Sequence, residues 1–177
     1  GTVGVRTDAN GRAAFTDLSL GGPVGPRTLR FSSPGLSVVI SRSVDVTSGP
    51  ATVAVISAGN SQTTAAGTAV PVAPAVRVSD GSGNPVPGVR VTFAVTAGGG
   101  SVTGAEPVTN AQGVAAVERW TLGTTIGQNT LSATVEGGSQ PLTFQATATV
   151  GPAAQITMIA GDSQTVSRPE SSPALCP

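Results

Sequence analysis

Apolar and polar residues alternate along several short stretches of this chain. In the stretch from Val89 to Thr96 every second residue is apolar, which predicts an extended strand with one buried face. Val76 and Val78 alternate in the same way just upstream, and the intervening Asp80–Gly88 is rich in glycine and proline, which favour turns. The pattern predicts two paired strands with a common buried face, at the centre of a β-sandwich.

Turn residues divide the rest of the chain into further short apolar runs. The predicted strands of the central region are 52–57, 72–79, 89–96, 101–109, 114–122, 129–136 and 141–150. A polar connection is expected over 60–67. Seven strands in about 100 residues are typical of an immunoglobulin-like Greek-key β-sandwich. We therefore predict an all-β fold of this class.

The alternation slips in one predicted strand. Ala115 and Val117 share a face, whereas Trp120 and Leu122 fall on the opposite one. A β-bulge near Glu118 and Arg119 would return Trp120 to the interior. The residues expected to form the core are Val76, Val78, Val89, Val91, Phe93, Val95, Val117, Trp120, Leu131, Val135, Leu142 and Phe144.

The chain resembles itself at an offset of 102 residues. Residues 49–63 align with 151–165, with eight of fifteen positions identical, and residues 7–14 align with 109–116 at the same offset. We therefore expect one complete repeat over 49–150, the C-terminal part of a preceding repeat over 1–48, and the N-terminal strand of a following repeat over 151–177. Because the two ends together would lack the central strands, we expect a piece of a longer array, and a head-to-tail filament stays open as the alternative.

The amino-acid composition limits which chemical functions the chain can have. Charged residues make up 10% of the chain and the formal net charge is zero, while 24 glycines and 14 prolines interrupt the apolar runs. Histidine and lysine are absent, which excludes histidine-dependent triads, histidine metal sites, lysine Schiff bases and Lys–Asn cross-links. Nine arginines are balanced by nine acids, so the sequence has no excess of positive charge with which to bind nucleic acid. No apolar run is long enough for a membrane helix. No direct membrane insertion or nucleic-acid partner is expected.

The candidate sites are few. Asp80, Ser82 and Asn84 carry side-chain oxygens at alternate positions, as a calcium loop does, but Pro85 follows where that loop has glycine and the closing glutamate is missing. A hydrogen-bonded Asx turn is the predicted structure, and residues 8–11 and 110–113 are predicted hairpin turns. Calcium near Asp45 or Asp162 at a junction between repeats stays open.

Neither catalysis nor a cofactor is expected. The acids that could pair, Asp80, Glu106, Glu118, Glu136 and Asp162, are too sparse for glycoside cleavage, and Trp120 is expected in the core rather than in a sugar platform. The single cysteine, Cys176, has no internal partner. It either lies beside a truncation point by chance or forms an intermolecular bridge.

Several motifs together resemble a known family. They are residues 161–165 (GDSQT), 76–80 (VRVSD), 83–89 (GNPVPGV), 91–93 (VTF), 98–102 (GGGSV), 109–115 (TNAQGVA), 120–123 (WTLG) and 129–131 (NTL). The chain resembles bacterial immunoglobulin-like repeats of the first group, the invasin/intimin type. The resemblance implies a tandem array on the bacterial cell surface that holds an adhesive tip away from the cell. Its partners would be neighbouring repeats of the same parent chain and, through other domains, host or environmental surface receptors.

The resulting functional prediction is a non-catalytic, extracellular spacer, the stalk of a cell-surface adhesin. Ligand-binding residues stay unknown, because binding in that family is concentrated outside the repeats. The alternatives are a glycan- or protein-binding module and a self-assembling filament or phage structural subunit.

Overall fold

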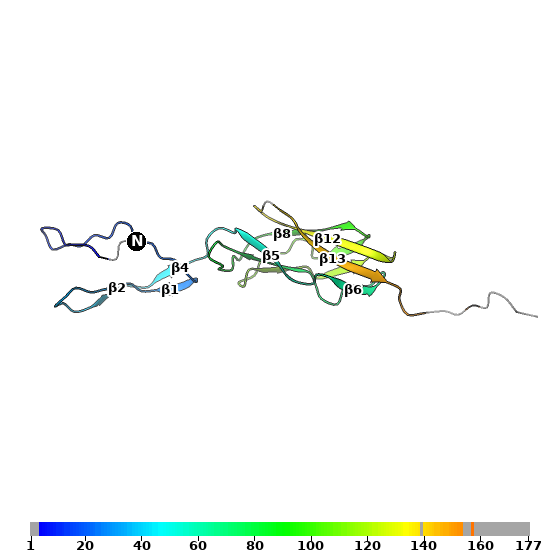
Figure 1. Cartoon of the computed structure of the whole chain (residues 1–177), viewed down its shortest axis with the longest axis horizontal. Coiled ribbons are helices and arrows are strands. Elements are labelled where there is room, and N and C mark those ends of the chain that lie inside the picture. Colours follow the sequence, from blue (N-terminus) through cyan, green and yellow to red (C-terminus); the bar gives the residue numbers. More distant parts are fainter. Residues whose placement is uncertain (1–3, 139, 154–156, 158–177) are drawn as a thin grey trace, which may run out of the picture.

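The computed structural model describes residues 4–138, 140–153 and 157, and within them it contains strands but no helix. The first strands are β1 (Gly25–Arg27), β2 (Arg30–Phe31), β3 (Val39–Ile40) and β4 (Val44–Val46). The others are β5 (Val53–Ala58), β6 (Gln62–Ala65), β7 (Ala75–Ser79), β8 (Val91–Ala97), β9 (Gly100–Thr103), β10 (Val114–Ala116), β11 (Arg119–Leu122), β12 (Gly127–Val135) and β13 (Leu142–Thr149). Figure 1 shows β1–β4 in a segment beyond one end of the body that contains β5–β13.

Two sheets form this body. One has the strand order β10-β7-β5 and the other β6-β13-β12-β8, while β9 pairs with β11 beside them. Within the second sheet β6 runs parallel to β13, and the other pairs are antiparallel. In β8, β12 and β13 buried residues alternate with exposed ones along much of the strand, and β7 is buried except at Arg77. This is expected when two sheets pack face to face. The body is therefore an all-β sandwich.

The interior between the two sheets is continuous. Val91, Trp120 and Phe144 are fully buried in one apolar cluster, and the rings of Phe93 and Phe144 lie 5.9 Å apart. Of the residues expected in the core, the structure buries Val76, Val78, Val91, Phe93, Val117, Trp120, Leu131, Val135 and Phe144. Val89, Val95 and Leu142 pack against the same cluster but stay partly exposed.

The predicted pairing of the two central strands is wrong. β7 and β8 belong to opposite sheets, because β7 pairs with β5 and β10, whereas β8 pairs with β12. The connection after β7 first folds back on it, with a bridge between Ser79 and Pro85 and a bond from the Val86 amide to the Val78 carbonyl. The chain then crosses to the other layer. Alternation identified the buried faces of both strands, but it carries no information on which strands are neighbours.

The polar connection expected over 60–67 contains β6 instead. Positive φ angles at Gly59 and Ser61 turn the chain from one sheet to the edge of the other. The Gln62 amide holds this edge by donating to the Val72 carbonyl and accepting from the Val72 amide. β6 carries no large apolar residue, so composition gave no sign of a strand there. Two other strands are shorter than predicted: β7 begins only after Pro74, and β9 ends at Thr103.

The irregularity predicted in strand 114–122 is present at Val117 and Glu118, one residue before the expected position. The strand is divided there into β10, which pairs with β7, and β11, which pairs with β9. Ala115, Val117, Trp120 and Leu122 are all buried as a result.

The N-terminal segment repeats the local geometry of the sandwich at the 102-residue offset. Asp8 Oδ1 accepts from the amides of Asn10 and Arg12, as Asn110 Oδ1 accepts from those of Gln112 and Val114. β1 pairs with β4 from Gly25↔Val46 to Arg27↔Val44. The same register joins Gly127↔Ala148 to Asn129↔Ala146 in β12 and β13. Further along, the two registers differ by one residue. Arg30 pairs with Ile40, whereas its counterpart Ser132 pairs with Thr143, which corresponds to Ser41.

Candidate functional site

The turn from Asp80 to Asn84 is the most highly organised polar group in the described part of the chain. Its Asp80 carboxylate is only 5% exposed and accepts four hydrogen bonds. The amides of Ser82 and Asn84 donate to Oδ1, both at 2.9 Å. The Gly49 amide donates to Oδ2 at 2.9 Å and the Asn84 side-chain amide at 3.0 Å. The turn is closed by Gly83, whose φ of 83° suits a residue without a side chain.

Asn84 connects this turn to the N-terminal segment. Its Nδ2 donates to the Gly22 carbonyl at 3.2 Å, and its Oδ1 accepts from the Val24 amide at 3.2 Å. Gly49, which bonds to Asp80, lies between β4 and the first strand of the sandwich. The turn thus holds both the peptide that connects the two parts at Gly49 and the loop just before β1 at Gly22 and Val24. We call these contacts the junction clasp.

The electrostatics of the clasp favour the ionised carboxylate. Hydrogen bonds from the Gly49 amide and the Asn84 side chain lower the pKa of Asp80 to about 2, against the opposing effect of burial, and the amides of Asn84 and Ser82 add to the lowering. Charge-assisted bonds of this kind are stronger than bonds between neutral groups. The clasp is therefore held by a charged acceptor at neutral pH.

The same geometry shows why these residues form an Asx turn rather than a calcium loop. Both Asp80 oxygens face N–H donors, so the lone pairs that a cation would use are already engaged. The side chain of Asn84 is likewise engaged on both sides. Elsewhere among the described residues, Asp45 included, no three acids or cysteines group closely enough to hold a metal ion. Asp162 and Cys176 lie outside the described residues.

Within the described residues, the other candidate acids form no group of three. Glu106 forms an exposed ion pair with Arg90 at 3.0 Å, and Glu118 lies beside Gly104 at the break between β10 and β11. Trp120 is fully buried, and its indole Nε1 has no partner within the described residues. It is part of the core, not of a ligand platform.

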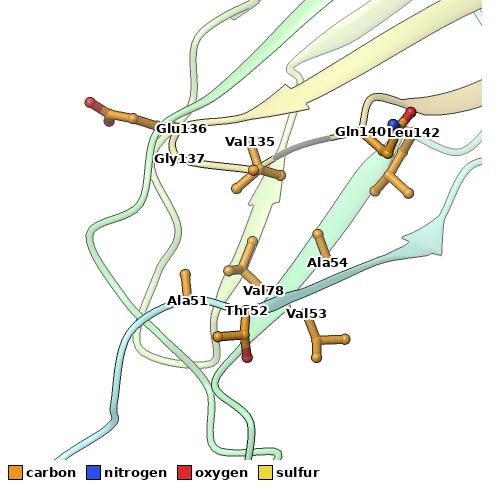
Figure 2. Close-up of a pocket in the computed structure, with 11 residues that line it drawn as sticks. Ala51, Thr52, Val53, Ala54, Val78, Val135, Glu136, Gly137, Gln140 and Leu142 are labelled. Carbon is orange, nitrogen blue, oxygen red and sulfur yellow. The ribbon is translucent and has the colours of Figure 1, made fainter.

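A notch of about 380 Å³ opens where the two sheets part near the β12–β13 connection (Figure 2). Its walls include Ala54 of β5, Val78 of β7, Val135 of β12 and Leu142 of β13. The one ionisable side chain that lines it, Glu136, points its carboxylate away from the space in Figure 2. The notch offers an apolar surface without convergent polar groups.

Sequence reasoning found the turn but missed its partners. Asp80 and Asn84 in a stretch rich in glycine and proline predict an Asx turn from local chemistry alone. The bonds from Asn84 to Gly22 and Val24 span about sixty residues, and no local pattern contains them. An available signal was Asp80 itself, a charged residue that comes directly after β7, a strand that is buried except at Arg77.

Comparisons with known proteins gave a structural likeness. No protein-family model matches the chain, and no curated protein matches it. Among solved structures, the chain is similar to the C-terminal 282-residue fragment of intimin in complex with the intimin-binding domain of the translocated intimin receptor. The two are 24% identical with a TM-score of 0.42, over 56% of this chain and 33% of that one, so the match spans about a third of the fragment. In the described region, no helix is long and apolar enough to span a membrane.

Proposed function

We propose that this chain is a non-catalytic structural module of a bacterial extracellular tandem-repeat protein, and that it serves as the stalk of a cell-surface adhesin. In this proposal residues 49–150 are one complete immunoglobulin-like repeat of the invasin/intimin type. Residues 1–48 end the preceding repeat and residues 151–177 begin the next. Its partners are neighbouring repeats.

The observation that carries the proposal is the junction clasp. A spacer must transmit a fixed direction from one unit to the next, and this requires specific contacts across the connection rather than a loose linker. Asp80 and Asn84 provide such contacts with Gly49, Gly22 and Val24. The turn and strand register shared at the 102-residue offset further support the assignment of the N-terminal segment to a repeat of the same kind.

The test is the distance between spin labels at Ser43 and Thr92, which lie on opposite sides of the clasp, with Cys176→Ser in all variants. Ser43 and Thr92 are both exposed. We expect a narrow distribution in the parent protein and a broad one in Asn84→Ala. Asn60→Ala is the control, because the Asn60 side-chain oxygen also accepts two backbone amides, those of Ser61 and Gln145, but lies beyond the opposite end of β5 from the clasp. Equally broad distributions in the parent and in Asn84→Ala would contradict a rigid spacer.

A binding assay separates the spacer from a binding module. The full chain is applied to a glycan array and to host cells, with the Asn84→Ala variant in parallel. The spacer proposal expects no saturable binding. Specific, saturable binding by the parent protein would favour the glycan- or protein-binding alternative instead.

A further inference from the structure

The N-terminal segment contains an apolar groove of about 840 Å³. Phe15, Leu18, Leu29, Phe31, Leu36 and Val39 are among the residues that line it. The rings of Phe15 and Phe31 lie 5.5 Å apart, yet Leu18 remains 42% exposed and Leu36 72% exposed. Large apolar side chains gathered in one open groove mark an interaction surface.

The lining of this groove matches the interior of the sandwich at the 102-residue offset. Ala13, Phe15, Leu18, Leu29 and Phe31 correspond to Ala115, Val117, Trp120, Leu131 and Ala133. Each of the latter is at most 3% exposed. The apolar residues of the groove also show the same change of spacing: two positions separate Ala13 from Phe15, and three separate Phe15 from Leu18. The sandwich has this change at the break between β10 and β11. The groove therefore has the layout of one half of a sandwich core.

The complete sandwich shows what covers such a half. β8 lies along β12, where it places Val95 opposite Leu131 and Phe93 opposite Ala133, and the β7 valines 76 and 78 join the same core. In the described residues β2, the counterpart of that part of β12, pairs only with β3. The edge that corresponds to the β8 side of β12 is open.

We propose that this groove is a docking surface for the β7–β8 half of the same preceding repeat that residues 1–48 end, which adds a strand along β2 and inserts alternating valines between Leu18 and Leu29. The inference rests on the proposed tandem-repeat function. Backbone hydrogen bonds along β2 provide the affinity, and every second side chain of the added strand enters the groove and provides the specificity. Because Phe31 stands where the sandwich has Ala133, the docking strand carries a residue smaller than phenylalanine at the position of Phe93.

The test is a fusion protein in which residues 49–102 are added ahead of Gly1 of the full chain. At the joint Val102 is then followed by Gly1, the counterpart of Thr103. Two versions are compared, one with Phe93 and one with Phe93→Ala in the added segment. The readouts are amide hydrogen exchange over residues 13–20 and 29–40 and the fluorescence of a dye that binds exposed apolar surface.

We expect exchange in these stretches to slow by about 100-fold on fusion, with a larger effect in the Phe93→Ala version, and dye fluorescence to fall. The control replaces Val76, Val78 and Val91 of the added segment with asparagine, and it should leave exchange and dye binding as in the unfused chain. Unchanged exchange in both fusions would overturn the proposal. So would a dimer of the unfused chain that protects the same stretches, because the occupant would then be a second copy. The spin-label test of the clasp does not involve the groove, so the two failures are distinguishable.

Discussion

Asp80 shows how a single residue serves two parts of the chain. Two of its hydrogen bonds close its own turn, and a third holds Gly49, thirty-one residues earlier. A carboxylate with all its acceptor positions filled is costly to protonate, because the neutral acid accepts these bonds less strongly. Its protonation state is therefore linked to the integrity of the clasp.

This linkage predicts a loss of stability in acid. The folded-state pKa of about 2 lies below the ordinary value of 3.8, so the contribution of Asp80 is fully present above about pH 4 and is lost as the pH falls through 2. In urea titrations followed by Trp120 fluorescence, the midpoint of the parent protein should fall over this window. Asp80→Asn should lose stability at pH 7 and show a weaker fall, while Asp45→Asn serves as the control. Identical pH profiles in the parent and in Asp80→Asn would contradict the assignment.

Gly100 represents a different constraint at the residue scale. It has a φ of 88°, and a Cβ there would overlap the backbone carbonyl of Thr121 across the β9–β11 pair. Gly11 has a similar φ of 75°, but open space surrounds the position of its Cβ. Gly100→Ala should therefore lower the unfolding free energy by at least about 2 kcal/mol through strain and overlap. Gly11→Ala, which lies outside the sandwich, should leave the Trp120 transition unchanged, and equal effects of the two would contradict the overlap.

At the scale of the element, periodicity predicted which faces are buried but not which strands meet. Val91, Phe93 and Phe144 were placed correctly because a period of two depends only on local backbone geometry. The pairing of β7 with β8 was mispredicted because strands joined by a long turn-rich connection can form a hairpin or cross between layers with the same alternation. β6 was missed because an edge strand needs few apolar residues. The irregularity before Trp120 could be predicted, because strict alternation would place this large aromatic side chain on the solvent-exposed face.

The corresponding elements β1–β2 and β12 differ in what covers them, and this predicts unequal effects of equal substitutions. Leu131→Ala removes a fully buried side chain and should cost about 2–5 kcal/mol of the unfolding free energy. Leu29→Ala, at the corresponding position of the partly buried N-terminal segment, should change the Trp120 transition by less than about 0.5 kcal/mol. Urea denaturation of both variants checks this, and a comparable loss in Leu29→Ala would show that the segment and the sandwich unfold as one.

At the scale of the whole molecule, the sandwich contains its own closed core and touches the N-terminal segment through the clasp. Residues 49–153 alone should therefore fold, with an unfolding free energy within about 2 kcal/mol of the full chain, because removing the segment breaks the Asn84 hydrogen bonds to Gly22 and Val24 but leaves the core intact. Trp120, the single tryptophan of the chain, reports this transition. A fragment without a cooperative transition would contradict an autonomous unit.

The parallel pairing of β6 with β13 has a mechanical consequence. The pairs run from Ala146↔Gln62 to Thr149↔Ala65, with β6 close to the start of the sandwich sequence and β13 close to its end. Tension applied along the chain pulls these two strands in opposite directions along their length. Their backbone bonds are then loaded in shear, all at once, whereas the strands of a terminal antiparallel hairpin would peel apart one bond at a time. The short polar edge strand β6, which the sequence pattern did not predict, is thus where a stretched chain would resist extension.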